Sequence, residues 1–157
     1  MNEVLLRKAS AEDAPSLSAV ILAAFEEYRG HLDPPSGAHG QTVDAVRQKL
    51  VTAQAVVALV NHDIVGCAFY EPEGDHIYLG RVAVLPQFRR QGIGRKLIAW
   101  VEAQSRWLGY ERVRLAVRVV LIDNRTLYER LGYCLHSYGT HAGYAEPTFV
   151  NLEKNVA

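Results

Sequence analysis

VLPQFRRQGIGRKLIAW, the stretch from Val84 to Trp100, is the most informative part of the sequence for the fold. Apolar residues and a proline open it, two arginines and two glycines follow, and apolar residues then recur at the three- and four-residue spacing of a helix. The order is therefore a strand, a glycine turn and the start of a helix. The first turn of a helix has unpaired N–H groups and the positive end of the helix dipole, and glycine lets a ligand approach that backbone closely. The stretch predicts a site for a bound anion.

Two common phosphate-binding motifs do not fit this turn. A P-loop needs four residues between its glycines and a Lys-Ser/Thr pair after them, whereas Gly92 and Gly94 are separated by Ile93 alone. A dinucleotide-binding motif needs a third glycine three positions beyond Gly94, where Leu97 stands. The pattern of one arginine, Arg89, followed by two closely spaced glycines therefore needs another explanation.

Seven strands and four helices are predicted around the turn. Apolar runs bounded by turn residues predict strands over 4–9, 55–60, 64–70, 76–85, 112–117, 133–138 and 147–153. Capping residues and helical spacing predict helices from Ser10 or Asp13 to about Glu27, from Thr42 onward, from about Gly92 to Leu108, and from Asn124 to Leu131. Tight turns are expected at 61–63 and 72–75. This order predicts an α+β fold with a mixed sheet, and the length predicts a single domain over 1–157.

Charge is unevenly distributed along a chain whose formal net charge is zero. Residues 81–130 carry eleven basic and four acidic residues, whereas 1–80 carry five basic and eleven acidic ones. A general nucleic-acid binder has a strongly basic domain, so we expect no nucleic-acid partner. The distribution fits a small polyanion bound by the middle of the chain and a cationic molecule bound by the rest, or a solvated surface of mixed charge. The counts alone leave both interpretations open.

Other sequence features indicate a soluble cytoplasmic protein. No uncharged apolar run approaches the ~18 residues of a membrane span, and the first residues lack the apolar core of a signal peptide. Cys67 and Cys134 stand in apolar surroundings and predict reduced core thiols. The six histidines lack a metal-ligand spacing, so we expect no metal. The absence of a long apolar run leads us to expect no membrane partner.

Two motifs together resemble a known family. The motif from Arg89 to Gly94 resembles the acetyl-CoA signature of the GNAT superfamily of N-acetyltransferases, (Q/R)-x-x-G-x-(G/A) between a strand and its helix. The motif from Asn124 to Tyr133, N-x-x-x-Y-x-x-x-G-Y, resembles the second signature of that superfamily. The order of elements agrees over nearly the whole chain. The resemblance implies a mostly antiparallel twisted sheet of about seven strands flanked by four helices, in which strands 76–85 and 112–117 run parallel and splay apart.

The resemblance also implies acetyl-CoA as cosubstrate. The residues that it places against acetyl-CoA are Val82, Val84, Arg89, Arg90, Gln91, Gly92, Ile93, Gly94, Arg95, Asn124 and Tyr128. Backbone amides of the glycine turn would hold the pyrophosphate, and Arg89 and Arg90 are candidates for its phosphates or solvated surface side chains. Pantetheine would pair with the strand edge at Val82 and Val84, where an amide near Val84 polarises the thioester carbonyl.

Tyr128 resembles the tyrosine that protonates the departing CoA thiolate. A phenol with a pKa of ~10 can protonate a thiolate whose conjugate acid lies near ~8.5 if it is well positioned. The alternative for Tyr128 is a half-buried packing tyrosine, whereas Tyr133 is expected to belong to the core. Asn124 resembles the residue that binds the pantetheine arm, or it caps a helix. Many members carry this asparagine seven positions before the tyrosine, where this chain has Leu121.

The acceptor site is expected between the first two helices and the last hairpin loop. Its candidate substrate-binding residues are Glu27, Tyr28, His31 and Tyr144, with Glu26 and Asp33 beside them. The acidic excess of residues 1–80 mildly favours a cationic amine. The attacking amine must lose a proton, and the candidate bases are Glu71, Glu73, Asp75, His76 and His141, each of which could also be an ordinary polar residue.

These inferences predict an enzyme that transfers an acetyl group from acetyl-CoA directly to a primary amine of a small molecule or peptide in a ternary complex. Two alternatives of other classes stay open. One is a non-catalytic acyl-CoA-binding or sensor domain, which would have no need of an acid at Tyr128. The other is a nucleotide-binding regulatory domain, which the two failed phosphate motifs disfavour. The sequence leaves a homodimer open.

Overall fold

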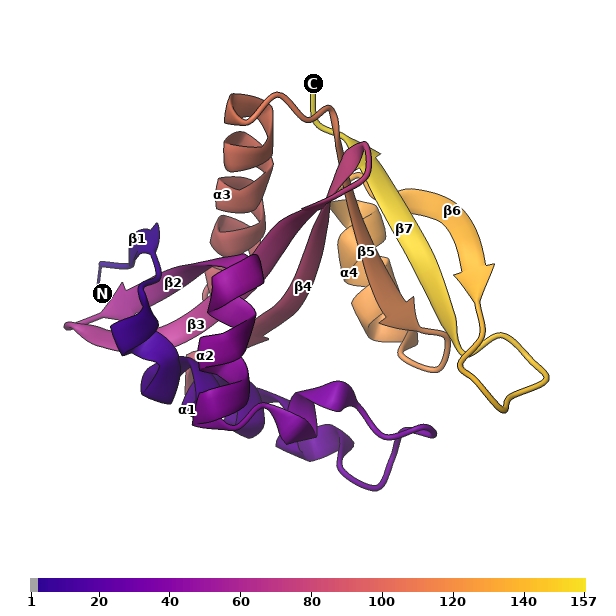
Figure 1. Cartoon of the computed structure of the whole chain (residues 1–157), viewed down its shortest axis with the longest axis horizontal. Helices are drawn as coiled ribbons and strands as arrows, with labels where there is room; N and C mark the ends of the chain where they lie inside the picture. Colours follow the sequence, from indigo (N-terminus) through magenta and orange to yellow (C-terminus); the bar gives the residue numbers. More distant parts are fainter. Residues whose placement is uncertain (1–2) are drawn as a thin grey trace.

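A seven-stranded mixed sheet in the order β1-β2-β3-β4-β5-β7-β6 runs through the computed structural model, which describes residues 3–157 (Figure 1). The strands are β1 (Leu5–Lys8), β2 (Gln54–Val60), β3 (Asp63–Glu73), β4 (His76–Val84), β5 (Arg112–Arg118), β6 (Cys134–Gly139) and β7 (Phe149–Asn155). The α-helices of the described chain are α1 (Ala14–Phe25), α2 (Val43–Thr52), α3 (Ile93–Trp107) and α4 (Ile122–Arg130). Within residues 3–157, β4 and β5 are the only strands that pair in parallel. The predicted fold class is therefore confirmed.

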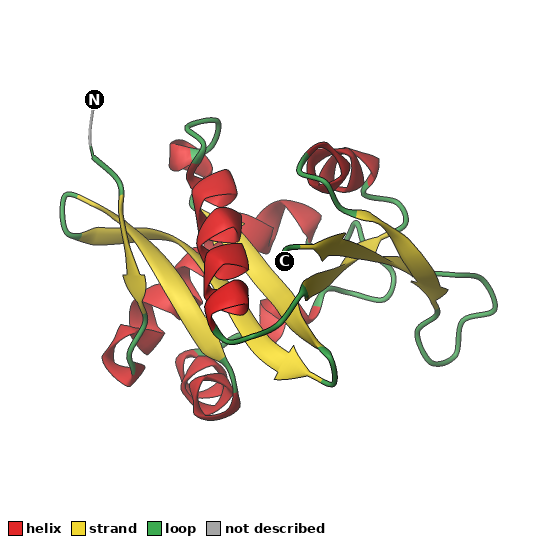
Figure 2. Ribbon diagram, turned by 90° about the horizontal axis from the view of Figure 1, so that it is seen from above, coloured by secondary structure: helices red, strands yellow, loops and turns green. Residues whose placement is uncertain are grey.

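Helices cover both faces of the sheet, as Figure 2 shows. Side chains alternate between the two faces along β2 because successive strand residues point to opposite sides. Val56, Ala58 and Val60 belong to the core beneath α3, whereas Ala55 and Val57 belong to the core beneath α1 and α2. No helix within residues 3–157 is long and apolar enough to cross a membrane.

The β2–β3 hairpin turns at Asn61 and His62, both at positive φ, as the sequence predicts. The next turn is shorter than predicted. Pro72 lies within β3 opposite Ile77, and the chain reverses only at Gly74 and Asp75. Pairing of β2 with β3 ends at Tyr70, so the edge of β3 beyond that residue has no partner strand in β2. Proline has no N–H to donate and is tolerated at such an edge.

Three other sequence-based predictions need correction. The first helix is not continuous, because 3-10 turns at Ala11–Asp13 and Glu26–Tyr28 flank α1. The third predicted helix ends at Trp107 rather than at Leu108, which is 49% exposed. Cys67 is buried as predicted, but Cys134 is exposed because it lies on β6, the outermost strand of the sheet.

The two parallel strands touch only at their beginnings. Ile77 pairs with Val113 and Tyr78 with Arg114, and beyond these pairs the strands diverge (Figure 1). A β-bulge contributes to the divergence: Cys67 and Phe69 of β3 lie opposite Ala83 and Gly80, so β4 carries an extra residue there. A bulge bends its strand and increases the local twist. The divergence opens a wedge between β4 and β5.

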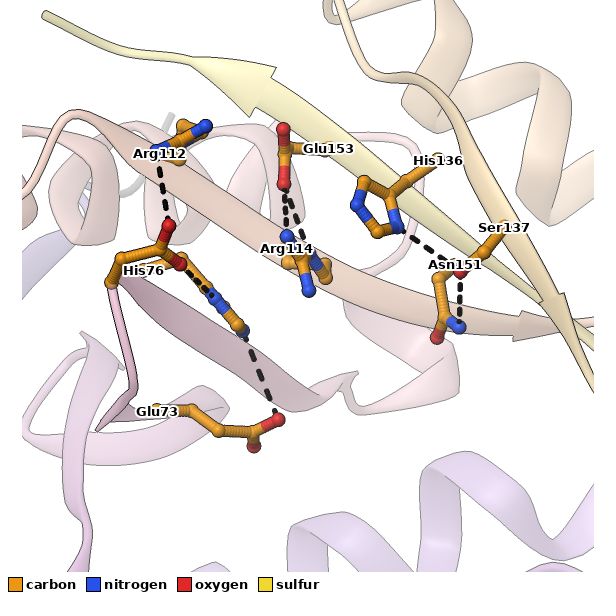
Figure 3. Close-up of polar contacts among 9 residues, drawn as sticks. Glu73, His76, Arg112, Arg114, His136, Ser137, Asn151 and Glu153 are labelled. Atoms are coloured by element: carbon orange, nitrogen blue, oxygen red, sulfur yellow. Dashed lines mark hydrogen bonds and ion pairs between the residues drawn. The ribbon is translucent and has the colours of Figure 1, made fainter.

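Ion pairs bridge the strands where the wedge closes (Figure 3). Asp75, in the β3–β4 turn, accepts a hydrogen bond of 3.0 Å from Arg112 at the start of β5. Arg114 donates two hydrogen bonds, of 2.9 and 2.6 Å, to Glu153 on β7. The Arg112–Asp75 pair is exposed, and exposed pairs contribute little stability, whereas the Arg114–Glu153 pair is partly buried. Their positions mark the closed end of the wedge.

Tyr133 is buried, as predicted, and forms a hydrogen-bonded group with two charged residues. Its hydroxyl donates to Glu102 at 2.8 Å, and the Lys154 ammonium lies 3.1 Å from both carboxylate oxygens of Glu102. Burial raises the pKa of Tyr133, and Glu102 raises it further, so the phenol remains a hydrogen-bond donor.

We expect Tyr133→Phe to lower the free energy of unfolding by about 2 kcal/mol, because a buried hydrogen bond to a charged group is lost. Urea unfolding measures the change. Tyr138→Phe is the matched control, since Tyr138 is 56% exposed on β6, and its effect should stay within about 0.5 kcal/mol. Equal effects of the two substitutions would show that the hydrogen bond contributes no net stability.

Candidate active site

Two adjoining cavities open at the wedge. The first, which we call the wedge cavity, has about 480 Å³ and lies between the diverging halves of β4 and β5. The second, the turn cavity, has about 610 Å³ and lies over the glycine turn at the start of α3. Both volumes fall within the ~300–1,000 Å³ range of small-molecule sites.

Five residues line both cavities: Phe25, Tyr28, Val82, Asn124 and Tyr128. They come from α1 and the turn that follows it, from β4 and from α4. We call them the junction. Two ligands bound one in each cavity would meet here.

The glycine turn forms the floor of the turn cavity. Gly92 has a φ of 78°, in the left-handed region that favours glycine, and a Cβ added there would meet no atom within 4 Å. Gly94, in the first turn of α3, also lines the cavity, and its added Cβ would find only Val84 at 3.9 Å. The first-turn N–H groups of α3 have no partner within the helix. This backbone is open to an anionic ligand and fits the pyrophosphate of acetyl-CoA.

The arginines of the turn have different surroundings. Arg89 donates to the carbonyl oxygen of Ala24 at 2.9 Å and pairs with Glu27 at 3.0 Å, so its guanidinium fixes the turn to the end of α1. Arg90 and Arg95 are exposed, line the turn cavity and form no ion pair within residues 3–157. Arg90 and Arg95 are therefore the arginines of this turn that are available to bind phosphates. Of the remaining predicted residues, Ile93 lines the cavity with its neighbours, whereas Gln91 is exposed and does not.

The edge of β4 provides the wall of the turn cavity. Val82 and Val84 both line it. Because β4 pairs with β5 only as far as Tyr78, no strand of the described chain covers the β5-facing edge of β4 beyond that residue. Backbone groups along this edge can hydrogen-bond an extended ligand, as a neighbouring strand would.

Tyr128 lies at the junction with its ring packed edge-to-face on Tyr133, 5.9 Å between centroids. Burial raises the pKa of Tyr128 to about 12, and Tyr28 and Tyr78 add to the shift. The phenol therefore stays protonated at neutral pH and can act only as a proton donor there. The packing role and the acid role are compatible in this position.

Asn124 also reaches the junction, where its side-chain amide donates to the Tyr28 hydroxyl at 3.4 Å. Its interpretation as a helix cap is wrong. α4 begins at Ile122, so that Leu121 occupies the capping position and Asn124 lies within the first turn. Its side chain is therefore free of the capping role.

The predicted acceptor residues separate into two groups. Tyr28 lies at the junction, and Glu27 lines the turn cavity, where it pairs with Arg89. His31 is exposed and lines neither cavity. Tyr144 also lines neither, and its hydroxyl donates to the Asp33 carboxylate.

The candidate bases also separate. Glu73, Asp75 and His76 lie at the closed end of the wedge and line neither cavity, with His76 3.1 Å from Asp75 (Figure 3). Glu71 lines the wedge cavity, and so does His141. Among the acidic residues of the described chain, Glu71 is the one that lines this cavity.

Sequence reasoning missed several polar residues of the wedge cavity, among them Tyr78, Arg81 and Arg118. A charged residue inside an otherwise apolar predicted strand was the available signal for Arg81, whereas Arg118 lies one position beyond the strand predicted over 112–117. The signal could not be used for Arg81, because the bulge in β4 changes which side chains face the wedge. The acidic excess of the first eighty residues does not reach this cavity, where Lys49, Arg81 and Arg118 outnumber Glu71.

Residues 21–133 match the model of the acetyltransferase (GNAT) family. An aminoalkylphosphonate N-acetyltransferase of Salmonella typhimurium is 28% identical over 135 residues, which cover 82% of this chain and 83% of that protein.

Solved structures agree in fold. The PaiA N-acetyltransferase of Thermoplasma acidophilum, in complex with coenzyme A, superposes with a TM-score of 0.81 at 17% identity, covering 98% of this chain and 99% of the other. A GNAT family acetyltransferase of Elizabethkingia anophelis with acetyl-CoA bound gives a TM-score of 0.74 at 19% identity, with 97% of each chain covered.

Proposed function

Because this chain belongs to the acetyltransferase (GNAT) family, we propose that it transfers the acetyl group of acetyl-CoA directly to a primary amine of a small molecule or peptide, with both substrates bound at once. The observation that carries the proposal is the junction between the two cavities. Donor and acceptor can enter from separate sides and meet beside Tyr128. We also propose that residues 1–157 act as a single domain, which the continuous sheet from β1 to β6 supports.

The turn cavity is proposed to hold acetyl-CoA. The amides around Gly92 and Gly94 bind the pyrophosphate, and the exposed Arg90 and Arg95 add charge-assisted contacts to the phosphates. The uncovered edge of β4 at Val82 and Val84 binds the pantetheine arm. A ligand held along this path ends at the junction.

Residues at the junction and in the walls of the two cavities then perform the transfer. Acetyl-CoA supplies an acetyl carbon that an amine can attack and a thiolate that can leave. Glu71 takes the surplus proton of the amine, directly or through water, since an ammonium has no free electron pair. A backbone N–H near Val84 polarises the thioester carbonyl as the C–N bond forms and the C–S bond breaks. Tyr128 donates its proton to the sulfur and regains a proton as the acetylated nitrogen loses its second one.

The size of the wedge cavity favours a small acceptor. The Salmonella relative acts, by its name, on aminoalkylphosphonates, which are small primary amines. A non-catalytic acyl-CoA sensor is the alternative. A sensor would use the turn cavity alone. Tyr128 and Glu71 both line the wedge cavity, where they supply an acid and a base.

Thermal unfolding with acetyl-CoA, CoA, ATP or NAD, followed by an amine panel with detection of released thiol, tests the proposal. Acetyl-CoA at about 100 times its Kd should stabilise the fold by about 2.7 kcal/mol, a rise in Tm of about 5–10 °C, and ATP and NAD should do less. Thiol release should depend on the amine. Stabilisation without turnover of any amine would favour the sensor, and equal protection by ATP or NAD would contradict the assignment of the turn cavity.

A further inference from the structure

Two arginines face the wedge cavity from the two diverging strands, Arg81 from β4 and Arg118 from the end of β5. Neither lies within 4 Å of a carboxylate oxygen in the described chain. The third basic residue of this cavity, Lys49, pairs with Glu71 at 3.5 Å, so those two charges offset each other. Two positive charges in the cavity remain without a counterion.

The position of Arg81 is built by the bulge of β4. Its φ is 50°, a left-handed conformation that costs a non-glycine residue about 1–3 kcal/mol. The guanidinium lies against the loop before α2, where a Cβ added to Gly37 would be 2.7 Å from Nη2. Burial lowers the pKa of Arg81, the Tyr78 phenol opposes that shift, and Arg118 adds to it. The groups that face Arg81 thus include a second cation and no carboxylate.

Arg118 is held by neutral groups. Its Nη1 donates to the carbonyl oxygen of Pro34 at 2.7 Å, and its Nη2 donates to that of Pro35 at 3.2 Å. Burial lowers the pKa of Arg118, whereas Tyr144 and Asp33 raise it. Asp33 accepts from the Tyr144 hydroxyl and forms no ion pair with the arginine. Carbonyl oxygens orient the guanidinium but leave its charge uncompensated.

Uncompensated, partly buried guanidinium groups are well suited to bind an anion, because their planar donor arrays match carboxylate and phosphonate oxygens. Arg81 is the chain neighbour of Val82, which lies at the junction. Because Arg81, Arg118 and the junction line one cavity, an anion bound by the two arginines would lie in the cavity that reaches the place where the amine must react.

We infer that Arg81 and Arg118 form a subsite for an anionic group of the acceptor, so that the substrate is a small primary amine bearing a carboxylate or a phosphonate. The inference rests on the proposed function for the amine end of the molecule. It replaces the simple cationic amine that the acidic excess of the first eighty residues favoured.

The test compares three acceptors of similar size: n-propylamine, 3-aminopropanoate and 2-aminoethylphosphonate. At least one of the two anionic amines should exceed n-propylamine about 30-fold in kcat/KM, and which of them does so separates the carboxylate from the phosphonate. Arg81→Gln and Arg118→Gln should each reduce that preference at least about tenfold, and Arg81→Lys, which keeps the charge, should restore part of it. Arg112→Gln is the matched control on β5, since Arg112 contacts Asp75 and lines neither cavity (Figure 3), and it should keep the full preference.

Calorimetric titration of the same three amines keeps the subsite testable apart from catalysis. Arginine-dependent binding of an anionic amine without turnover would preserve the subsite and contradict the proposed function. Turnover with no preference for the anionic amines, or a preference that both glutamine variants retain while they unfold at the wild-type temperature, would overturn the inference. Absence of both binding and turnover of the anionic amines would also overturn it.

Discussion

Replacing Tyr128 by phenylalanine is expected to lower kcat about 100-fold while leaving the KM for acetyl-CoA nearly unchanged. The substitution removes one hydroxyl at the junction of the two cavities and keeps the ring that packs on Tyr133. Positioned general acids contribute typically ~10²–10⁴-fold, and a thiolate that leaves without a proton is a poorer leaving group. Thiol release at saturating acetyl-CoA and amine measures the change.

The pH dependence of the wild type gives a second readout. Burial raises the pKa of Tyr128 to about 12, above the ordinary phenol value of ~10, so the protonated form persists as pH rises until the folded-state pKa is reached. The activity should therefore show no alkaline decline from this group below about pH 11. Tyr138→Phe, on the exposed β6 strand, is the control and should retain wild-type kcat. A Tyr128→Phe enzyme within threefold of wild type would remove Tyr128 from the acid role.

Replacing Gly94 by aspartate should weaken acetyl-CoA binding at least about 100-fold without unfolding the protein. Gly94 lies in the first turn of α3, where an acidic side chain interacts favourably with the helix dipole. An added Cβ would meet only Val84, at an ordinary 3.9 Å. The apo protein should thus be as stable as wild type or slightly more so. The new carboxylate stands where we place the pyrophosphate. The helix end therefore tolerates the carboxylate, but its negative charge would repel the ligand.

Isothermal titration with acetyl-CoA and thermal unfolding of the apo protein measure the two effects separately. Gly94→Ala is the matched control, because it adds the Cβ without the charge and should weaken binding much less. Equal Kd values for Gly94→Asp and wild type, with both proteins folded, would place the pyrophosphate elsewhere.

Local features of the fold could be predicted from the sequence because short-range geometry decides them. Gly92 and Gly94 mark the start of α3 through backbone conformation and spacing alone, and the Asn61-His62 turn needs only its two neighbouring strands. The apolar residues of β2 indicate that both faces of this strand are buried, although they do not show which helices cover them. Tyr128 could be singled out because its motif is continuous along one short helix.

Side chains that meet across the sheet could not be predicted in the same way. The junction joins Tyr28, Val82 and Tyr128, which come from three separate elements, and the predicted His31 and Tyr144 line neither cavity. The loops that carry His31 and Tyr144 could be assigned to the region of the site. The direction of each side chain, however, depends on contacts made by other parts of the chain.

The order of the elements, the glycine turn at the start of α3 and the position of Tyr128 on α4 follow from the sequence alone. The charge of the wedge cavity depends on the tertiary structure. Strand side chains change face with a shift of one residue, and the bulge at Arg81 introduces such a shift through the pairing of β4 with β3. Because strand pairing sets the register and the bulge, Arg81 and Arg118 line one cavity only in the folded sheet.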